Sequence, residues 1–362
     1  MSGDLLIILV YRTGRGSPQY VGRVSLNFTI SSVADIRALL AEMPSRDLDA
    51  VAAWGAREPQ LTKPAGSLGR LEDLSQWLSA WQGRHPPRLA TPRARVFAGN
   101  HGVAALGVSA FPAEVTLQMV ANFRHGGAAI NQLCKAFDVQ LDVVALDLER
   151  PSADFTQGAA LSEDEFVAAF ASGMESVPAD TDLLVIGEMG IGNTTPAAAV
   201  SCALFGGEAA DWTGRGTGVE GGALARKIEV VAAGVKLHRG NPPLDILRRL
   251  GGRELAAMAG AVVAARLGRV PVMLDGYVTT AAVAALALER ADALDHCMVG
   301  HVSVEPGHLR LMGKLGKTAL LDLGMRLGEG SGAAVAVGLV KAAVACHVGM
   351  ATFAEAGVSD KG

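Results

Sequence analysis

Three acidic residues stand in positions that suit catalytic carboxylates. Glu188 and Asp275 each follow a short apolar run, and Glu329 lies inside a glycine-rich string. Apolar runs of this length form buried parallel strands, and the carboxyl ends of such strands meet at one edge of the sheet. Each acid also has a structural explanation. Glu188 could accept hydrogen bonds from loop N–H groups, Asp275 before a glycine could form a turn, and Glu329 could stabilise a helix N-terminus through the helix dipole. Together, however, the three predict a carboxylate cluster at one sheet edge.

A glycine-rich stretch runs from the apolar residues 183–186 into a predicted helix, residues 197–204. Its glycines are Gly187, Gly190 and Gly192. Thr194 and Thr195 are candidate hydroxyl caps for the helix, and Pro196 suits its first turn. A strand that leads through glycines into a helix N-terminus can hold an anion on free N–H groups, although an ordinary strand–helix turn has the same pattern. The stretch is neither a Walker loop nor a G-x-G-x-x-G fingerprint.

Further polar residues could complete an anion site. Lys227 could bind an anion, but a lysine in a helix is by default a solvated surface charge. Ser303, at a strand end, offers a hydroxyl and an N–H group to an anion, and the same groups would serve an ordinary turn. His101 has neither a serine nor a cysteine at a diagnostic spacing, so we interpret it as a loop or core residue with satisfied hydrogen bonds. Three residues lie in or just before one predicted helix: Phe111, Gln118 and Met119. Side chains in such positions usually belong to the core, and the alternative is that they line a pocket.

Composition places the chain among globular α/β proteins. Of its 362 residues 50% are hydrophobic and 44 are glycine, which favours buried strands and tight turns over disorder. The formal charge of −4 gives no reason to expect nucleic acid or an anionic membrane as a partner. Lys341 interrupts the longest apolar run, so we expect no membrane span. The 4 cysteines form no C-x-x-C pair, and with no signal-peptide pattern they indicate a reducing, cytoplasmic location.

Strands and helices alternate from about residue 95, which predicts an α/β fold with a mostly parallel, Rossmann-like sheet and flanking helices. The predicted strands are residues 96–98, 141–146, 183–186, 270–274 and, as the last of the sheet, 297–302. The predicted helices include residues 48–57, 71–81, 112–123, 127–137, 223–237, 253–267, 278–289 and an alanine-rich one that reaches about residue 353. Ser32 with Asp35, and Ser162 with Glu165, indicate two further helix starts. Residues 1–30 match no clear element.

Six groups of residues, in this order, resemble the nicotinate-nucleotide–dimethylbenzimidazole phosphoribosyltransferase family. They are KPAGSLGRLE (63–72), HGV with GVSAFPAEVTLQMVANF (101–103 and 107–123), GEMGIGNTTPAAA (187–199), ARKIEVV (225–231), MLDGYVTT (273–280) and MRLGEGSGAA (325–334). The resemblance covers about residues 32–356, and the third and last strings are highly specific. It implies a homodimer, with active sites near the subunit interface.

The resemblance also implies domains. We expect an extension over residues 1–30 that need not be ordered, and a large α/β catalytic domain over residues 91–330. A small helical domain would then combine residues 31–90 with a C-terminal helix in residues 331–362.

Site roles follow from the same resemblance. Glu329 matches the family's catalytic base, and Glu188 and Asp275 match its other active-site acids. Phosphate and ribose positions are matched by Gly190, Lys227 and Ser303, to which we add Gly192, Asn193 and Thr194. Benzimidazole-lining positions are matched by Phe111, Met119 and Leu327, to which we add Gln118. Two positions depart from the family: Asn100 replaces an aspartate of many relatives, and Met119 replaces a glutamine of some, with Gln118 one residue earlier.

The implied reaction moves phosphoribose from nicotinate mononucleotide to 5,6-dimethylbenzimidazole, giving α-ribazole 5′-phosphate and nicotinate. No pyrophosphate leaves, and the sequence shows no aspartate-rich or histidine-rich metal spacing, so we expect neither a metal nor another cofactor. Two alternatives stay open. One is a phosphoribosyltransferase for another base, and the other is a non-enzymatic nucleotide-binding protein on the same scaffold.

Overall fold

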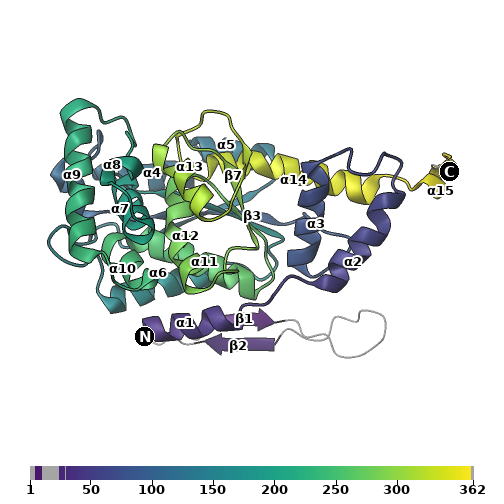
Figure 1. Ribbon diagram of the computed structural model, residues 1–362, viewed down its shortest axis with the longest axis horizontal. Coiled ribbons are helices and arrows are strands. Elements are labelled where there is room, and N and C mark those ends of the chain that lie inside the picture. Colours follow the sequence, from purple (N-terminus) through teal and green to yellow (C-terminus); the bar gives the residue numbers. More distant parts are fainter. Residues whose placement is uncertain (1–4, 10–23, 29, 360–362) are drawn as a thin grey trace.

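The computed structural model of the chain describes residues 5–9, 24–28 and 30–359. Figure 1 shows a central sheet with helices on both faces and a group of helices that projects at one end. The strands are β1 (Leu5–Leu9), β2 (Val24–Phe28), β3 (Pro92–Ala98), β4 (Gln140–Ala145), β5 (Leu183–Met189), β6 (Val272–Leu274), β7 (Cys297–His301) and β8 (Ala319–Leu321).

The helices follow the strands in alternation through most of the chain. They are α1 (Val33–Glu42), α2 (Leu48–Arg57), α3 (Arg70–Gln82), α4 (Glu114–His125), α5 (Ala129–Ala136), α6 (Glu163–Glu175), α7 (Thr194–Phe205), α8 (Ala209–Trp212), α9 (Gly221–His238), α10 (Pro243–Leu250), α11 (Arg253–Leu267), α12 (Tyr277–Glu289), α13 (Pro306–Lys314), α14 (Ser331–Gly349) and α15 (Phe353–Ala356). Two short 3-10 helices span Glu58–Gln60 and Gly102–Leu106.

The main sheet is parallel throughout and has the strand order β4-β3-β5-β6-β7-β8. The prediction of a mostly parallel α/β fold is therefore confirmed. The chain runs from β3 outward to β4 and then returns to β5 on the other side of β3. The loops after β3 and β5 consequently leave the sheet in opposite directions. In open parallel sheets the crevice between such loops is where ligands bind.

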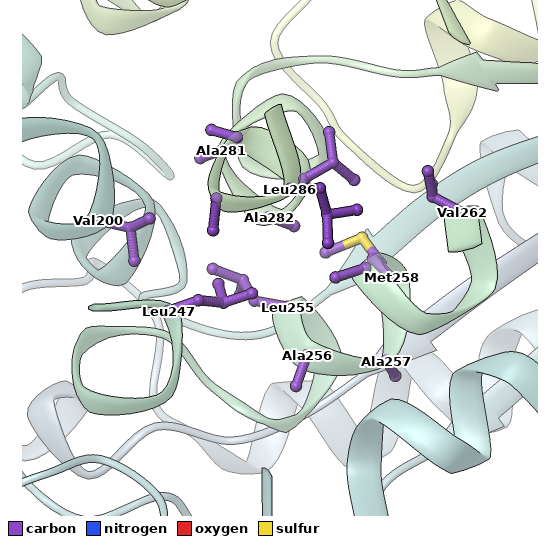
Figure 2. Packing of buried hydrophobic residues seen from close by; sticks show 14 of the residues in the cluster. Val200, Leu247, Leu255, Ala256, Ala257, Met258, Val262, Ala281, Ala282 and Leu286 are labelled. Atoms are coloured by element: carbon purple, nitrogen blue, oxygen red, sulfur yellow. The ribbon is translucent and has the colours of Figure 1, made fainter. Parts of the chain in front are cut away.

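Side chains of β5 alternate between two cores, one on each face of the sheet. Leu184 and Ile186 belong to a core shared with α6, α7 and α10–α12, whereas Leu183 and Val185 belong to a core shared with α3, α5 and α14. This alternation is the two-residue period of a strand buried on both faces. Figure 2 shows part of the first core, where Val200 of α7 and Leu247 of α10 pack near α11 and α12.

Helices from the two ends of the chain lie side by side in the projecting group (Figure 1). Arg57, the last residue of α2, donates to the carbonyl oxygens of His347 at 3.1 Å and Met350 at 2.9 Å. α1 packs elsewhere, because Ile36 lies in the core around α11 and Arg37 pairs with Glu289 of α12 at 3.2 Å.

Several boundaries differ from the predictions. β5 extends to Met189, so Gly187 and Glu188 lie in the strand and not in the loop. Neither Thr194 nor Thr195 caps α7. The cap position is Asn193, and both threonines lie in the first helical turn. β8 follows β7, which corrects the expectation that residues 297–302 form the last strand.

Two further expectations concern the chain ends. β1 and β2 pair antiparallel within residues 1–30, where the sequence indicated no element. By length and composition alone α14, with 19 residues and a mean hydropathy of 1.7, is apolar enough to cross a membrane, so Lys341 does not by itself exclude a span. Such a property is weak evidence, since core helices share it. The first half of α14 is buried against the sheet.

The closest helix contact joins α6 and α11 through two glycines. A Cβ atom on Gly173 would lie 1.8 Å from the carbonyl oxygen of Ala257, and one on Gly260 would lie 2.0 Å from that of Phe170. Real Cβ atoms do not approach backbone so closely, so both positions require glycine. α11 is thereby seated beneath β3 and β5, which matters for the site described below.

Gly260→Ala is therefore expected to lower the melting temperature. Overpacking a core costs about 1–3 kcal/mol, which exceeds the gain of roughly 1 kcal/mol from replacing glycine with alanine in a helix. The matched control is Gly55→Ala in α2, where a Cβ atom meets nothing within 4 Å and the melting temperature should hold or rise. Similar melting temperatures for the two variants in differential scanning calorimetry would contradict this packing.

Candidate active site

The three predicted acids come together at the carboxyl edge of the main sheet. The N–H group of Glu329 donates to the carbonyl oxygen of Glu188 at 3.2 Å, which joins the loop before α14 to the end of β5. A Cβ atom on Gly187 would lie 2.4 Å from the carbonyl oxygen of Glu329, and one on Gly328 would lie 2.2 Å from Glu188 Oε1. Glycine at both positions thus permits the loop to lie directly on the strand.

Glu329 is held in an unusual backbone conformation. Its φ of 64° is left-handed, and the flanking Gly328 and Gly330 have φ of 83° and 86°. A left-handed glutamate is strained, and such strain is often found at functional sites. The side chain is buried, and Oε2 accepts the N–H of Ile130, in the first turn of α5, at 3.4 Å. Burial raises the pKa of Glu329 above its usual value; the Ile130 bond opposes this rise and the charge of Asp275 adds to it.

Glu188 is joined to the start of the next helix. Its Oε2 accepts a short hydrogen bond from the side-chain amide of Asn193, at the start of α7. Burial raises the pKa of Glu188 to about 8, and the charges of Asp275, Glu254 and Glu329 add to this rise against the Asn193 bond. In the free protein Glu188 therefore holds a proton at neutral pH.

Asp275 lies beside the N-terminus of α14. Its Oδ1 accepts the N–H of Ala333, in the first turn of α14, at 2.9 Å, and lies 3.5 Å from His301 Nε2. Burial would lower the pKa of His301, but the hydrogen bond and charge of Asp275 raise it above its usual value. The carboxylate is fully buried.

A second cluster surrounds Lys227 of α9, which is buried and not solvated. Its Nζ donates to Thr194 Oγ1 at 2.7 Å and to the carbonyl oxygen of Gly214 at 3.0 Å. Because an ammonium has three donors, one is left for a further acceptor. Burial lowers the pKa of Lys227 to about 8, an effect that the charge of Glu305 partly opposes. A bound phosphate would supply the anion that the ammonium lacks.

Ser303 is joined to the same cluster through Glu305. Ser303 Oγ accepts the N–H of Glu305 at 3.3 Å, and Glu305 Oε1 accepts the N–H of Gly216 at 2.8 Å. The N–H of Ser303 itself donates to His308 Nδ1 at 2.9 Å, so only the hydroxyl remains for a phosphate, contrary to our expectation.

Glu305 and His308 escaped the sequence analysis, since neither stands in a recognisable motif. His308 Nδ1 accepts from Ser303, so its other nitrogen carries the proton toward Thr280 Oγ1, 3.1 Å away. Burial lowers the pKa of His308 to about 3, so the ring is neutral and holds the Ser303 loop in place.

The predicted benzimidazole residues are less closely gathered. Thr116 Oγ1 in α4 accepts the N–H of Ile191 at 3.1 Å, which fixes α4 over the glycine loop. Met119, one turn later, is half-buried, whereas Gln118 is exposed. Phe111 and Leu327 are 52% and 55% exposed, so they line a surface and not a closed pocket.

Their loops are nevertheless connected through residues 216 and 217. Thr217 Oγ1 lies 3.1 Å from Ser109 Oγ, two residues before Phe111, and Arg326, which precedes Leu327, donates to the carbonyl oxygen of Gly216 at 3.4 Å. This connection runs from the Lys227 cluster to both exposed apolar side chains.

The remaining predicted residues, Gly190 and Gly192, shape the turn after β5. Gly192 has a φ of 85°, which suits glycine. A Cβ atom on Gly190 would lie 2.7 Å from the carbonyl oxygen of Gly99 and 3.3 Å from Glu254 Oε1. One side of this turn thus faces a carboxylate, a group that the sequence analysis did not identify.

Within residues 5–9, 24–28 and 30–359 no three histidine, cysteine or acidic side chains form a metal-binding group. Independence of metals stays a prediction. A separate hollow of about 370 Å³ lies over α7–α9, lined by Cys202, Lys236 and Arg239 among others, and contains none of the predicted site residues.

Comparison with known proteins points to one family. A family model described as phosphoribosyltransferase matches residues 43–358. The nicotinate-nucleotide–dimethylbenzimidazole phosphoribosyltransferase of Ruegeria pomeroyi is 60% identical over 331 residues, covering 91% of this chain and 98% of that protein. That of Cereibacter sphaeroides is 58% identical over 332 residues, with coverage of 91% and 98%. The crystal structure of CobT from Thermus thermophilus has a TM-score of 0.80 and 41% identity, covering 86% of this chain and 100% of that one.

The raised pKa of Glu188 predicts a pH-dependent cost in stability. Between pH 4.5, where the unfolded side chain ionises, and about pH 8, the folded state binds more protons than the unfolded state. The free energy of unfolding therefore falls as pH rises through this range. Glu188→Gln, which cannot ionise, should have a higher melting temperature than the wild type, and the difference should be larger at pH 8 than at pH 5. The exposed Glu229→Gln in α9 is the control, and a difference independent of pH for Glu188→Gln would contradict the assignment.

Proposed function

The chain belongs to the nicotinate-nucleotide–dimethylbenzimidazole phosphoribosyltransferase family, and from this premise we propose that it transfers phosphoribose from nicotinate mononucleotide to 5,6-dimethylbenzimidazole. The products are α-ribazole 5′-phosphate and nicotinate, a step of cobalamin biosynthesis. The observation that carries the proposal is the gathering of Glu188, Asp275 and Glu329 at one sheet edge, with the buried Lys227 cluster reached through Asn193 and Thr194 at the start of α7.

Lys227 and its neighbours would hold the 5′-phosphate. The remaining donor of Lys227 and the Ser303 hydroxyl are both suited to an anion. Glu305 already accepts the N–H of Gly216, which positions the loop beside Lys227. The phosphate stays on the product, so this site needs to bind and not to react.

The carboxylates would act on the ribose and on the incoming base. The bond between ribose C1′ and the pyridinium nitrogen breaks, its electron pair passes to that nitrogen, and nicotinate leaves. One benzimidazole nitrogen forms the new bond to C1′, and the N–H proton of the other passes to Glu329. General base catalysis of this kind contributes roughly 10²–10⁴ in rate. Glu188, once it has lost its proton, and Asp275 would stabilise the positive charge that develops on the ribose.

Bound substrates also change the electrostatics of the cluster. The pyridinium ring of nicotinate mononucleotide brings a positive charge to a site where four acids repel one another. A cation favours the ionised form of a neighbouring carboxyl group. Binding of the nucleotide would therefore release the proton from Glu188 and prepare the carboxylate for the transfer step.

We also propose a cytoplasmic homodimer. Exposed apolar side chains lie on joined loops near the site, where Phe111 and Leu327 are connected through Thr217 and Gly216. The N–H of Val304, also exposed, donates to Met325 in the loop that precedes Leu327. A second subunit covering these loops would enclose the base.

Lys227→Ala is expected to raise the Michaelis constant for nicotinate mononucleotide roughly ten- to hundredfold, because a charge-assisted hydrogen bond contributes about 1.5–3 kcal/mol. The Michaelis constant for the base should change far less. Lys236→Ala, on the exposed face of the same helix, is the matched control. Steady-state kinetics with each substrate varied in turn measures this, and equal changes for both substrates would mean that Lys227 has only a structural role.

Glu329→Gln is expected to abolish most transfer and to leave nucleotide binding nearly intact, since the amide keeps the shape of the side chain and loses only proton acceptance. Mass spectrometry of the products, together with calorimetric titration of nicotinate mononucleotide, measures both properties. Turnover like that of the wild type would move the role of base to another residue, with Glu188 the first candidate.

A panel of bases in the same assay separates the alternatives. Faster transfer to another benzimidazole, a purine or a phenol would mean a different acceptor. Nucleotide binding without any transfer would favour a non-enzymatic nucleotide-binding protein. The number of acids at the site argues against the latter, because an anionic nucleotide would bind more readily without them.

A further inference from the structure

A buried hydrogen-bonded pair of side chains lies beneath the crevice between β3 and β5. His101 follows β3, and Glu254 is the second residue of α11, 153 positions later in the chain. His101 Nε2 lies 2.6 Å from Glu254 Oε1, and both side chains are completely buried. The order of the strands reverses at this point of the sheet. A buried carboxylate therefore lies beneath the backbone that forms this crevice.

Three glycines surround the Glu254 carboxylate. A Cβ atom would lie 2.4 Å from Glu254 Oε2 if placed on Gly99, and 2.8 Å from it if placed on Gly252. On Gly190 it would lie 3.3 Å from Oε1. The backbone at the ends of two adjacent strands thus rests directly on this side chain. Part of the glycine content of the loop after β5 is explained by this contact, and not only by an anion above it.

The hydrogen bonding of the pair favours an ionised Glu254. Neither His101 Nδ1 nor Glu254 Oε2 has a hydrogen-bond partner among the described residues. If Nε2 carries the imidazole proton and donates it to Glu254, the unpartnered Nδ1 is only an acceptor, whereas the reverse arrangement would bury an unpartnered N–H group. Buried N–H groups without partners are the rarer case. The N-terminus of α11 also favours a negative charge at this position.

We propose that Glu254, fixed by His101, is a positioning residue for the transfer reaction: its carboxylate supports the Gly99 and Gly190 backbone and places a permanent negative charge beneath Glu188. This inference rests on the proposed function. The charged groups that face Glu188 are Glu254 from α11, Asp275 from the loop after β6 and Glu329 from the loop before α14. Asp275 and Glu329 lie on the substrate side of the cluster by their proposed roles. Glu254 is completely buried and alone has no access to the substrate.

The role of Glu254 explains how Glu188 can change its protonation with the state of the site. Burial and the charges of Asp275, Glu254 and Glu329 together keep the proton on Glu188 until the nucleotide binds, and Glu254 contributes from below. When the positively charged pyridinium ring of the nucleotide is bound above, the proton leaves and the ionised Glu188 faces the ribose. Without the charge of Glu254, Glu188 would ionise at a lower pH, because one of the three like charges that add to the effect of burial would be gone.

Two measurements on Glu254→Gln test this inference. The glutamine keeps an oxygen that accepts from His101, so the variant removes the charge and retains the shape. In a double-mutant cycle of thermal stability, the stabilisation produced by Glu188→Gln should be smaller in the Glu254→Gln background than in the wild type. In the pH profile of kcat/KM for nicotinate mononucleotide, the acid limb should move to lower pH by about one unit, a roughly tenfold gain in kcat/KM on that limb.

His101→Gln is the second variant. A glutamine amide can still donate to Glu254 and leaves its charge in place, so the acid limb should stay where it is in the wild type. The inference would be overturned if the effects of Glu188→Gln and Glu254→Gln on thermal stability were additive and the acid limb of Glu254→Gln lay at the same pH as in the wild type. The pair would then have a purely structural role. The cycle requires no turnover. If the wild type transfers no phosphoribose, the proposed function fails, and the cycle still decides whether Glu254 acts on Glu188.

Discussion

Repulsion among carboxylates is the interaction on which the site depends. Glu188, Asp275, Glu329 and Glu254 come from four separate segments and converge on the carboxyl edge of one parallel sheet. Burial raises the pKa of Glu188, and the like charges that folding brings beside it add to this rise. A site of this kind is unstable when fully ionised without a ligand, and it is complete only when a cation is bound. The nucleotide proposed as substrate carries that cation on its pyridinium ring.

The fold makes this arrangement tolerable by providing each acid with a donor. Glu329 accepts from Ile130 at the start of α5, Asp275 from Ala333 at the start of α14, and Glu188 from Asn193 at the start of α7. Glu254 itself lies in the first turn of α11. Helix N-termini favour negative charge, and in a parallel α/β sheet the helices that follow the strands begin at this same edge. The fold therefore brings the acids together and also places helix N-termini where they partly stabilise the negative charges.

Much of the fold was predictable because local patterns decide it. The bounds of α2 and α11 agree with the predictions, because each helix coincides with a clear amphipathic or apolar run of residues. The three residues of β8 were missed because so short a strand leaves no period-two pattern, and α10 was missed because Pro242 and Pro243 resemble a linker. Glu188 was expected at the mouth of a loop, yet pairing with β3 extends β5 through it.

The site was predictable in part. Strand ends and glycine strings indicated Glu188, Asp275 and Glu329, and the family resemblance drew attention to Lys227. Contacts between distant segments were not visible in the sequence. Glu254 stands in an ordinary helix start, and only the tertiary fold brings His101 to it across 153 positions. For the same reason the sequence did not show that His308 accepts a hydrogen bond from the N–H group of Ser303.

Proton release on nucleotide binding tests the central claim most directly. Isothermal titration calorimetry of nicotinate mononucleotide at pH 7, repeated in buffers of different ionisation enthalpy, gives the number of protons exchanged. Glu188, with a pKa of about 8, holds its proton at this pH, and Lys227, also with a pKa of about 8, is already charged. We expect release of nearly one proton by the wild type and almost none by Glu188→Gln. Binding by the wild type without proton release would contradict it.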